Sequence, residues 1–579
     1  MALPCTDEGL PIFFRRKHLL YHDVVVVGGG FAGMRAALSA KAAGANVGLI
    51  SKVHPMRSHS SGSHSGINAS LKPHDSWEVH LQDTLKAGEY LNNQDAVEIL
   101  CKEAKTEIAT LENFGMVFSR DEHGFIDVTN FSGSSIPRTA FSGDSLGHIL
   151  LQVLYERIVR EQIVTYDEWM VSSILVDNGS CRGVVAREFK TGDLHIVSGK
   201  TVILATGNLG KLYQFSTCSL TGTGDGQALA YRAGASLVDM EFIQYAPTAI
   251  KRRGILITEM ARAMGGYLLN KNGDRFLKSY SPDLMELAPR HIINQAIFQE
   301  ISEGRGEGDS VFLDMRHLNR EMFSDQLRET EYLLRDLEDL NPEKDLIPVQ
   351  PAMHRPIGGI QTDTKGATTV PGLFAVGECS NNGSHGAGRL GGNSLLDNMV
   401  FGRLAGEAAA GYISCDSSKI ELDRVFGKEQ DKFGELFNRD STDELPGMLR
   451  RELSNIMDVH VGYRRDKLGL ENALKLITEL AARTKKLGIS NKNAQFNMEP
   501  QMLLELEFMM QLARVMVRSA LSREESRGDH NRTDYPYTDN SNWLKHTVVT
   551  QVNGEDKLHY TEVVSTRWKE MEVENGSHS

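Results

Sequence analysis

The most informative part of the sequence is Asp23-Val-Val-Val-Val-Gly-Gly-Gly-Phe-Ala-Gly33. Its four valines form a continuous apolar run, which is typical of a strand buried on both faces of a parallel sheet. The glycines Gly28, Gly30 and Gly33 follow, and an alanine-rich helix is expected from about Met34 to Ala43. Glycine permits a tight turn and a close backbone approach, and the N-terminus of the helix offers N–H donors to phosphate. The pattern therefore predicts a β-α-β unit that binds the pyrophosphate of a dinucleotide.

The second strand of this unit, expected from Asn46 to Ser51, ends without an acidic residue. Many dinucleotide-binding folds carry an acid there that binds ribose, whereas this chain has Ser51 followed by Lys52. We expect these two residues to contact the cofactor although neither is acidic.

Two later strands also end at glycine. They are expected at Thr201–Gly207, where Ala205 and Gly207 close the strand, and at Pro371–Gly377. Such separated pieces indicate one nucleotide-binding domain that is interrupted by an insertion, and they favour FAD over NAD. Glu378 follows the last of these strands, and we expect its carboxylate to meet ribose or ribityl hydroxyl groups of the cofactor.

Composition excludes several classes of protein. Of 579 residues, 40% are hydrophobic and 24% are charged, as in globular proteins, and the net charge of −13 argues against a nucleic-acid partner. Six cysteines are scattered without a C-x-x-C pair, which favours free thiols in a reducing compartment. Any iron–sulfur cluster would then belong to another chain. No apolar run approaches the length of a membrane span.

A series of motifs carries a specific resemblance. They are Arg57-Ser-His-Ser60, Thr223-Gly-Asp-Gly226, Thr258-Glu259 with Arg262, His354 with Gly358-Gly-Ile360, His385-Gly-Ala-Gly-Arg389-Leu-Gly-Gly-Asn393-Ser-Leu-Leu, Glu525-Ser-Arg-Gly-Asp-His530 and Asn542-Trp-Leu-Lys-His546. In order and spacing, along nearly the whole chain, they resemble the flavoprotein subunits of succinate dehydrogenase and fumarate reductase.

The resemblance implies an α/β fold. It consists of a Rossmann-like FAD-binding domain with an inserted α+β capping domain, a helical domain and a small C-terminal domain. Combined with the composition of the chain, it gives these expected boundaries: 1–243 and 351–414 for the FAD-binding domain, 244–350 for the capping domain, 415–526 for the helical domain and 527–579 for the C-terminal domain.

The resemblance also assigns cofactor contacts. In this family the histidine of the R-S-H motif is joined covalently to the flavin, which implies covalent FAD at His59. A covalent bond of this kind raises the flavin potential, as the oxidation of an unactivated C–C bond requires. The other contacts expected from the motifs are Ser58, Gly66, Asp225, Asn393, Ser394 and Leu395.

The implied reaction interconverts succinate and fumarate, which carry two carboxylates. Arg389 can bind one carboxylate with a bidentate fork, His354 can add a hydrogen bond, and Thr258 is expected at the other carboxylate. Reduction needs a hydride from flavin N5 and a proton from the opposite face. The resemblance assigns the proton to Arg290, with Glu259 and Arg262 as a relay back to solvent.

Several positions depart from the family pattern. Where the family has a substrate-binding histidine in Gln-Phe-His-Pro-Thr-Gly, this chain has Ala246. Either His64 and Arg355 replace the lost donor and the substrate remains a C4 dicarboxylate, or the substrate differs at that end. Other departures are Ser63 and Ser65 beside His64, Pro356 and Ile357 after Arg355, His291 after Arg290, and Met264 after Arg262.

The same residues also bear on other functions. An L-aspartate oxidase is disfavoured by His59, and an adenylylsulfate reductase by the Glu259–Arg262 pair, while a reductase of another unsaturated acid stays open. A non-catalytic electron-relay subunit is disfavoured because Arg290 and Arg389 are both present. The expected partners are an iron–sulfur subunit and a membrane-anchor or quinone-reactive subunit. The chain would then be cytoplasmic and peripheral on the inner face of a membrane.

Overall fold

The structure, a computed structural model, describes residues 18–64, 66–412 and 422–566. Among these residues the largest sheet has seven strands, in which β1 lies at the centre between β2 and β9. Strands β6, β2, β1, β9 and β16 run parallel, and β8 and β7 add an antiparallel edge. The strands are β1 (His18–Val27), β2 (Val47–Ser51), β6 (Val164–Asp167), β7 (Trp169–Asp177), β8 (Ser180–Glu188), β9 (Leu194–Leu204) and β16 (Leu373–Ala375).

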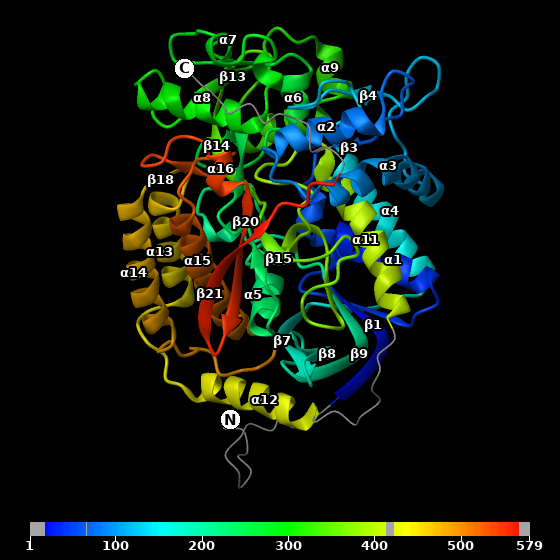
Figure 1. Cartoon of the computed structure of the whole chain (residues 1–579), viewed down its shortest axis with the longest axis vertical. Helices are drawn as coiled ribbons and strands as arrows, with labels where there is room; N and C mark the ends of the chain where they lie inside the picture. Colours follow the sequence, from blue (N-terminus) through cyan, green and yellow to red (C-terminus); the bar gives the residue numbers. More distant parts are fainter. Residues whose placement is uncertain (1–17, 65, 413–421, 567–579) are drawn as a thin grey trace.

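The valine run of β1 is buried on both faces, as its composition predicts. The strand begins five residues earlier than expected, because His18 to His22 also pair with β9 in parallel register. Helices α1 (Phe31–Ala42) and α11 (Asn393–Gly411) pack together beside this sheet (Figure 1). Glycine makes this contact possible, since a Cβ atom on Gly406 would lie 2.3 Å from the carbonyl oxygen of Ala36.

A second layer forms the upper part of the molecule in Figure 1. Its antiparallel sheet has the order β11-β14-β13-β12, and its helices enclose a separate hydrophobic cluster. The strands are β11 (Ile243–Ile250), β12 (Tyr267–Leu269), β13 (Val311–Asp314) and β14 (Ile347–Pro356). The helices are α6 (Glu259–Ala263), α7 (Leu277–Tyr280), α8 (Arg290–Ser302), α9 (Arg320–Asp325) and α10 (Arg328–Tyr332).

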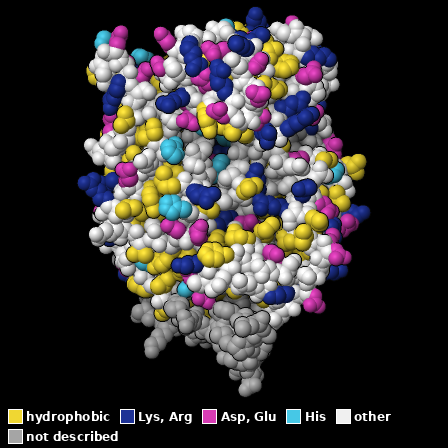
Figure 2. All heavy atoms as spheres, turned by 180° about the vertical axis from the view of Figure 1, so that it is seen from behind, with side chains coloured by type: hydrophobic (Ala, Val, Ile, Leu, Met, Phe, Trp, Pro, Cys, Tyr) yellow, Lys and Arg dark blue, Asp and Glu magenta, His cyan; other side chains and the backbone are white. Residues whose placement is uncertain are grey.

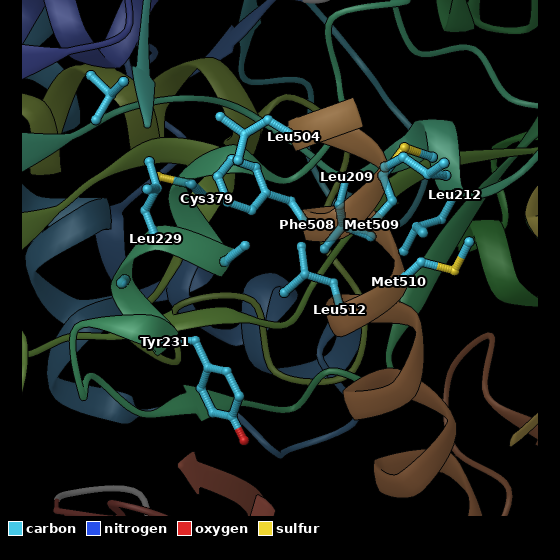
Figure 3. Close-up of a cluster of buried hydrophobic side chains, with 14 of the residues drawn as sticks. Leu209, Leu212, Leu229, Tyr231, Cys379, Leu504, Phe508, Met509, Met510 and Leu512 are labelled. Carbon is cyan, nitrogen blue, oxygen red and sulfur yellow. The ribbon is translucent and has the colours of Figure 1, made fainter. Parts of the chain in front are cut away.

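Long helices α13, α14 and α15 form the left side of Figure 1, and α12 lies below them. Figure 3 shows how α15 joins the helices to the cofactor-binding part: Phe508 and Leu512 lie against Leu229 of α5 and Leu209. Burial of one such side chain contributes roughly 1.5–3 kcal/mol. The helices are α5 (Asp225–Arg232), α12 (Leu422–Asn438), α13 (Pro446–His460), α14 (Lys467–Thr484) and α15 (Glu499–Ser522).

The C-terminal strands close a five-stranded sheet with the order β17-β15-β10-β20-β21. Its strands are β10 (Leu237–Val238), β15 (Gly359–Gln361), β17 (Ser380–Asn381), β20 (Lys545–Val552) and β21 (Glu555–Glu562). The remaining helices and strands are α2 (Trp77–Ala87), α3 (Gln94–Phe114), α4 (Leu146–Arg160), α16 (Asn540–Trp543), β3 (Ile67–Asn68), β4 (Val128–Thr129), β5 (Thr139–Ala140), β18 (Arg464–Arg465) and β19 (Asn531–Arg532).

The expected fold class is confirmed: a Rossmann-like sheet, an inserted α+β layer, a helical part and a small C-terminal part are all present. The domain boundaries given above stay a prediction. On the face shown in Figure 2, basic and acidic side chains are interspersed rather than gathered into one basic surface. None of the helices in the described part of the chain is long and apolar enough to cross a membrane. Four cysteines are free and buried, while Cys5 and Cys415 lie outside the described residues.

Candidate functional site

A cavity begins where β1, β2, β9 and β16 end and extends to the loops beneath the upper layer. Fifteen residues that the sequence predicts for cofactor or substrate line it: Gly28, Gly30, Ser51, Lys52, Ser58, His59, His64, Ala205, Gly207, Asp225, His354, Glu378, Arg389, Ser394 and Leu395. The carboxyl ends of parallel strands are where α/β folds bind ligands. Eight other predicted residues do not line the cavity: Gly33, Gly66, Thr258, Glu259, Arg262, Arg290, Arg355 and Asn393.

The glycine turn after β1 leaves room that side chains would fill. Gly28 has φ of 121°, and a Cβ atom there would lie 2.1 Å from the carbonyl oxygen of Ala205. A Cβ atom on Gly33 would lie 1.9 Å from the carbonyl oxygen of Gly28, so this glycine permits helix–strand packing. Gly30 is the N-cap of α1, whose N-terminus faces the cavity. The bare turn and the helix N-terminus fit the pyrophosphate of FAD.

Lys52 directly follows β2, at the position where the sequence lacks an acid. Its ammonium group lies 2.7 Å from Asp225 and 2.9 Å from Glu505. Burial would lower the pKa of Lys52, but these two carboxylates raise it. The acidic group on this side of the cavity is therefore Asp225, the first residue of α5. Glu505 lies 453 residues from Lys52 along the chain, and no local motif predicts that contact.

His59 lies in a single 3-10 turn, His59–Gly62, at the wall of the cavity. Its Nδ1 atom accepts a hydrogen bond from the backbone N–H of Ser219 at 3.3 Å. Nδ1 therefore carries a lone pair, and no residue in the described ranges bonds to Nε2. The free nitrogen is the one available for a bond to a cofactor.

The turn after β16 and the start of α11 form another wall, and Glu378 in this turn accepts a hydrogen bond from Asn208 at 2.9 Å. Burial would raise the pKa of Glu378, but the positive charge of Arg355, 3.9 Å away, lowers it. Arg355 also donates to the hydroxyl of Ser394. Arg355 thus lies behind the cavity wall, where it supports two residues that do line the cavity.

Asn393, Gly66 and Thr258 have local roles that explain why they do not line the cavity. The side chain of Asn393 is fully buried and bonds to Asn68, His80 and Thr84, which fixes the first turn of α11. A Cβ atom on Gly66 would meet the backbone of Ala140 at 2.4 Å. Thr258 is the N-cap of α6, where it accepts from the N–H of Met260, and it donates to the carbonyl oxygen of His64.

Arg290, Glu259 and Arg262 form one buried cluster. Nη2 of Arg290 lies 2.5 Å from Oε2 of Glu259, and Nη2 of Arg262 lies 3.6 Å from Oε1. Burial would raise the pKa of Glu259, but the two arginines and the N–H of Ser132 lower it to about 2. Arg262 also donates to the hydroxyl of Ser132 and, at 2.6 Å, to the carbonyl oxygen of Glu286. No motif in the sequence points to Ser132 or Glu286.

Arg389 carries a buried positive charge without a counterion. Its side chain donates to the carbonyl oxygen of Leu390 at 3.0 Å, its Nε has no partner, and no described carboxylate forms an ion pair with it. Burial, with Arg290 and Arg355 nearby, holds its pKa well below the ordinary value. Because burial of an unpaired charge is costly, this arginine favours binding of an anion beside it.

His354 faces the same cavity from β14 and is neutral. Its Nδ1 atom lies 2.8 Å from the hydroxyl of Thr217. Burial, together with the positive charges of Arg290 and Arg389, holds the pKa of His354 well below its ordinary value. A neutral imidazole that is fixed by a hydroxyl group can still donate one hydrogen bond into the cavity.

His64 lines the cavity, but its Nδ1 atom is already used. It lies 2.8 Å from the carbonyl oxygen of Asp144, which can only accept, so Nδ1 carries the proton. Nε2 can donate to an anion only in the protonated imidazolium. Ala246 pairs with Ala352 in the β11–β14 ladder and is buried.

Two family models match the chain. Residues 23–395 match an FAD binding domain, and residues 450–576 match the fumarate reductase flavoprotein C-terminal region. The match to the FAD binding domain covers the glycine turn, all but one of the residues that line the cavity, and the upper layer.

Individual relatives extend over nearly the whole chain. A fumarate reductase flavoprotein subunit of Mycobacterium tuberculosis is 40% identical over 570 residues, covering 94% of this chain and 98% of the relative. A succinate dehydrogenase flavoprotein subunit of Rickettsia bellii is 37% identical, covering 92% and 93%. Among solved structures, a chain of Escherichia coli quinol fumarate reductase superposes with a TM-score of 0.91 at 37% identity, covering 95% of this chain and 98% of that chain.

These matches agree with the expected resemblance and with a cavity built for FAD. The chain belongs to the family of fumarate reductase and succinate dehydrogenase flavoprotein subunits, and it is an FAD-dependent oxidoreductase.

Proposed function

We propose that this chain is the catalytic flavoprotein subunit of a complex that interconverts succinate and fumarate. The observation that carries the proposal is Arg389, a buried cation without a counterion that faces the cavity, with the Arg290–Glu259–Arg262 cluster in the next layer of side chains. Such a site favours an anion that must also exchange a proton. The names of the relatives, which include succinate dehydrogenase and fumarate reductase subunits, support this substrate pair.

The guanidinium group of Arg389 would donate two hydrogen bonds to the nearer carboxylate of the substrate. His354 would add a hydrogen bond from Nε2, with the hydroxyl of Thr217 donating to Nδ1 and so fixing the tautomer. Because His354 is neutral, it orients the carboxylate without adding a charge. Thr258, as the cap of α6, would act through the position of the α6 start rather than by direct contact.

Proton transfer would use the buried cluster. Arg290 lies behind the lining of the cavity and has no protein partner at Nε and Nη1, so these buried N–H groups could still donate to a substrate that reaches them. In reduction Arg290 would release a proton to that carbon and regain one from Arg262 through Glu259. Between transfers Glu259 is ionised because its pKa is about 2, and this favours the protonated form of Arg290 before each transfer. FAD, when bound, would supply or accept the hydride at N5.

His59 would carry the covalent bond to FAD. The support is the free Nε2 atom at the cavity wall, with Nδ1 already held by Ser219. Gly28, Gly30, Asp225, Glu378 and the start of α11 would hold the rest of the cofactor.

The partners would be an iron–sulfur subunit and a membrane-anchor or quinone-reactive subunit. The support is the absence of a C-x-x-C pair from the sequence, and the quinol fumarate reductase complexes among the similar structures. The chain would then lie on the inner, cytoplasmic face of a membrane, held there by its partners.

A second candidate is a reductase or oxidase of a related acid with a different group at one end. The observation that favours it is Ala246, which is buried and offers no hydrogen bond where the family pattern has histidine. His64 could replace that donor only when doubly protonated.

The deciding experiment is a substrate panel with the purified protein, its flavin and an artificial dye acceptor or donor. We expect turnover with succinate or fumarate, and loss of most of it in Arg389→Gln. Turnover with another acid only, or an unchanged rate in Arg389→Gln, would reject the assignment.

A further inference from the structure

The loop that follows α2 holds an acidic residue in a strained conformation. Glu89 and Tyr90 have φ of 52° and 57°, in the left-handed region that residues with side chains rarely adopt. Strain of this kind persists where surrounding contacts over-determine the backbone. Here Arg527 donates to the carbonyl oxygen of Glu89 at 2.8 Å, and the N–H of Tyr90 donates to the carbonyl oxygen of Leu85 at 3.0 Å.

The same loop supports the segment that presents Arg389. The N–H of Ala387 donates to the carbonyl oxygen of Gly88 at 2.9 Å. A Cβ atom on Gly386 would lie 2.3 Å from that same oxygen. Because backbone rests directly on backbone, a displacement of Glu89 would be passed to residues 386–389.

The side chain of Glu89 reaches the upper layer. Its Oε1 atom lies 3.1 Å from Nε2 of His291, and both side chains are about one quarter exposed, at 28% and 23%. His291 directly follows Arg290 in the first turn of α8. The contact therefore connects the loop beneath Arg389 with the helix that carries Arg290.

The charges around His291 explain why Glu89 is its partner. The surroundings of His291 are positive, because Arg290 and the N-terminus of α8 lie beside it, and they favour a carboxylate nearby. The carboxylate of Glu259 is already held by Arg290, Arg262 and Ser132, and that of Asp529 by the N–H of Tyr245 and the amide of Asn294. Glu89 is thus the carboxylate left to His291.

We propose that Glu89 and His291 form a positioning pair that fixes Arg290 relative to Arg389. This inference rests on the proposed function, in which the two arginines act on one dicarboxylate. Neither member of the pair touches the substrate. Their contact instead sets the separation of the anion-binding arginine and the proton-donating arginine.

The test uses the flavin-loaded protein and a charge swap. Glu89→Gln and His291→Asp should each lower kcat for fumarate reduction about tenfold, since small misplacements at reacting groups have large rate effects. The KM for fumarate should change less, and the unfolding temperature should stay near that of wild type. Glu89→Lys combined with His291→Asp restores an ion pair with reversed charges and should recover most of the lost rate. Wild-type kcat in both single variants, or a double variant that is no faster than His291→Asp alone, would overturn the proposal.

A readout independent of turnover separates this inference from the proposed function. Amide hydrogen exchange of residues 385–389 should quicken in Glu89→Gln and return towards wild type in the double variant. Unchanged exchange would overturn the positioning pair, whereas wild type that is inactive with both acids would overturn the proposed function. The control is Glu122→Gln, beside His123 on the surface, which should change neither readout.

Discussion

The ammonium group of Lys52 lies 2.9 Å from the carboxylate of Glu505, although 453 residues separate them in the sequence. The pair joins the wall of the cofactor cavity to the second turn of α15, so the helical part contributes a charge to the FAD site.

Replacement of Glu505 by Gln should therefore weaken both stability and cofactor binding. Lys52 would keep Asp225 but lose one of its two neutralising charges, at a cost of about 1–3 kcal/mol. Thermal unfolding and the flavin content of the purified variant measure the two effects. Glu507→Gln is the control, since Glu507 lies on the same helix and its ion pairs are more exposed. Equal unfolding temperatures for both variants would contradict the prediction.

Glu259→Gln should stop the proton relay while leaving the cavity intact. Glutamine can accept a hydrogen bond from Arg290 but cannot pass a proton to it, so we expect kcat for fumarate reduction to fall by about 10²–10⁴-fold. Equilibrium binding of succinate, followed through the flavin absorbance, should change little. A variant that retains full kcat would show that protons reach the substrate by another route.

The same carboxylate should make stability depend on acid pH. The pKa of Glu259 falls from an ordinary 4.5 to about 2 in the folded protein. A depressed pKa means that its stabilising contribution is complete above pH 4.5 and is lost as pH falls towards 2. The difference in the free energy of unfolding between wild type and Glu259→Gln should therefore shrink between about pH 5 and pH 3 in urea titrations. A constant difference over this range would contradict the pKa shift.

Covalent flavin at His59 can be tested directly. Acid-precipitated wild type should fluoresce on a denaturing gel under ultraviolet light, because the flavin would remain joined to the chain. His59→Ser should retain FAD without the bond and show a lower flavin potential. His54→Ser, which changes a histidine in the preceding turn, is the matched control and should keep the fluorescence. A colourless wild-type pellet with all flavin in the supernatant would exclude the linkage.

The altered substrate end can be tested through His64 and Ala246. If the imidazolium of His64 holds the second carboxylate, His64→Ala should raise the KM for fumarate roughly tenfold or more, the equivalent of about 1.4 kcal/mol. Ala246→His in that background should restore part of the affinity. An unchanged KM in His64→Ala would indicate that this histidine only supports the loop through Asp144, and would favour an acid with a different group at this end.

The parts of the site that the sequence could predict are those fixed by local geometry. Gly28 and Gly33 are required by a turn and a close approach within a few residues, and Glu259 and Arg262 share one face of α6. The link from Arg290 to Glu259 spans 31 residues, and the family resemblance, rather than any local pattern, pointed to it.

The remaining contacts depend on packing between distant segments. Glu505 reaches Lys52 from another part of the fold, and the contact of Glu89 with His291 requires two strained residues that no motif reports. Arg355 lies behind the wall because Ser394 and Glu378 hold it there. A list of polar residues cannot distinguish such support from direct contact.

Gly406 lies far from the cavity, but its close contact with α1 affects how α11 is placed at the cavity wall. Gly406 lies thirteen residues beyond the start of the helix, about 20 Å along its axis. A methyl group there would collide with the carbonyl oxygen of Ala36 and push α11 away from α1. The first turn of α11 presents Ser394 and Leu395 to the cavity and is held by the hydrogen bonds of Asn393, so a tilt of the helix would strain this turn and shift the two residues. Replacement of Gly406 by Ala, far from any ligand, would thus change the absorption spectrum and the redox potential of the bound flavin.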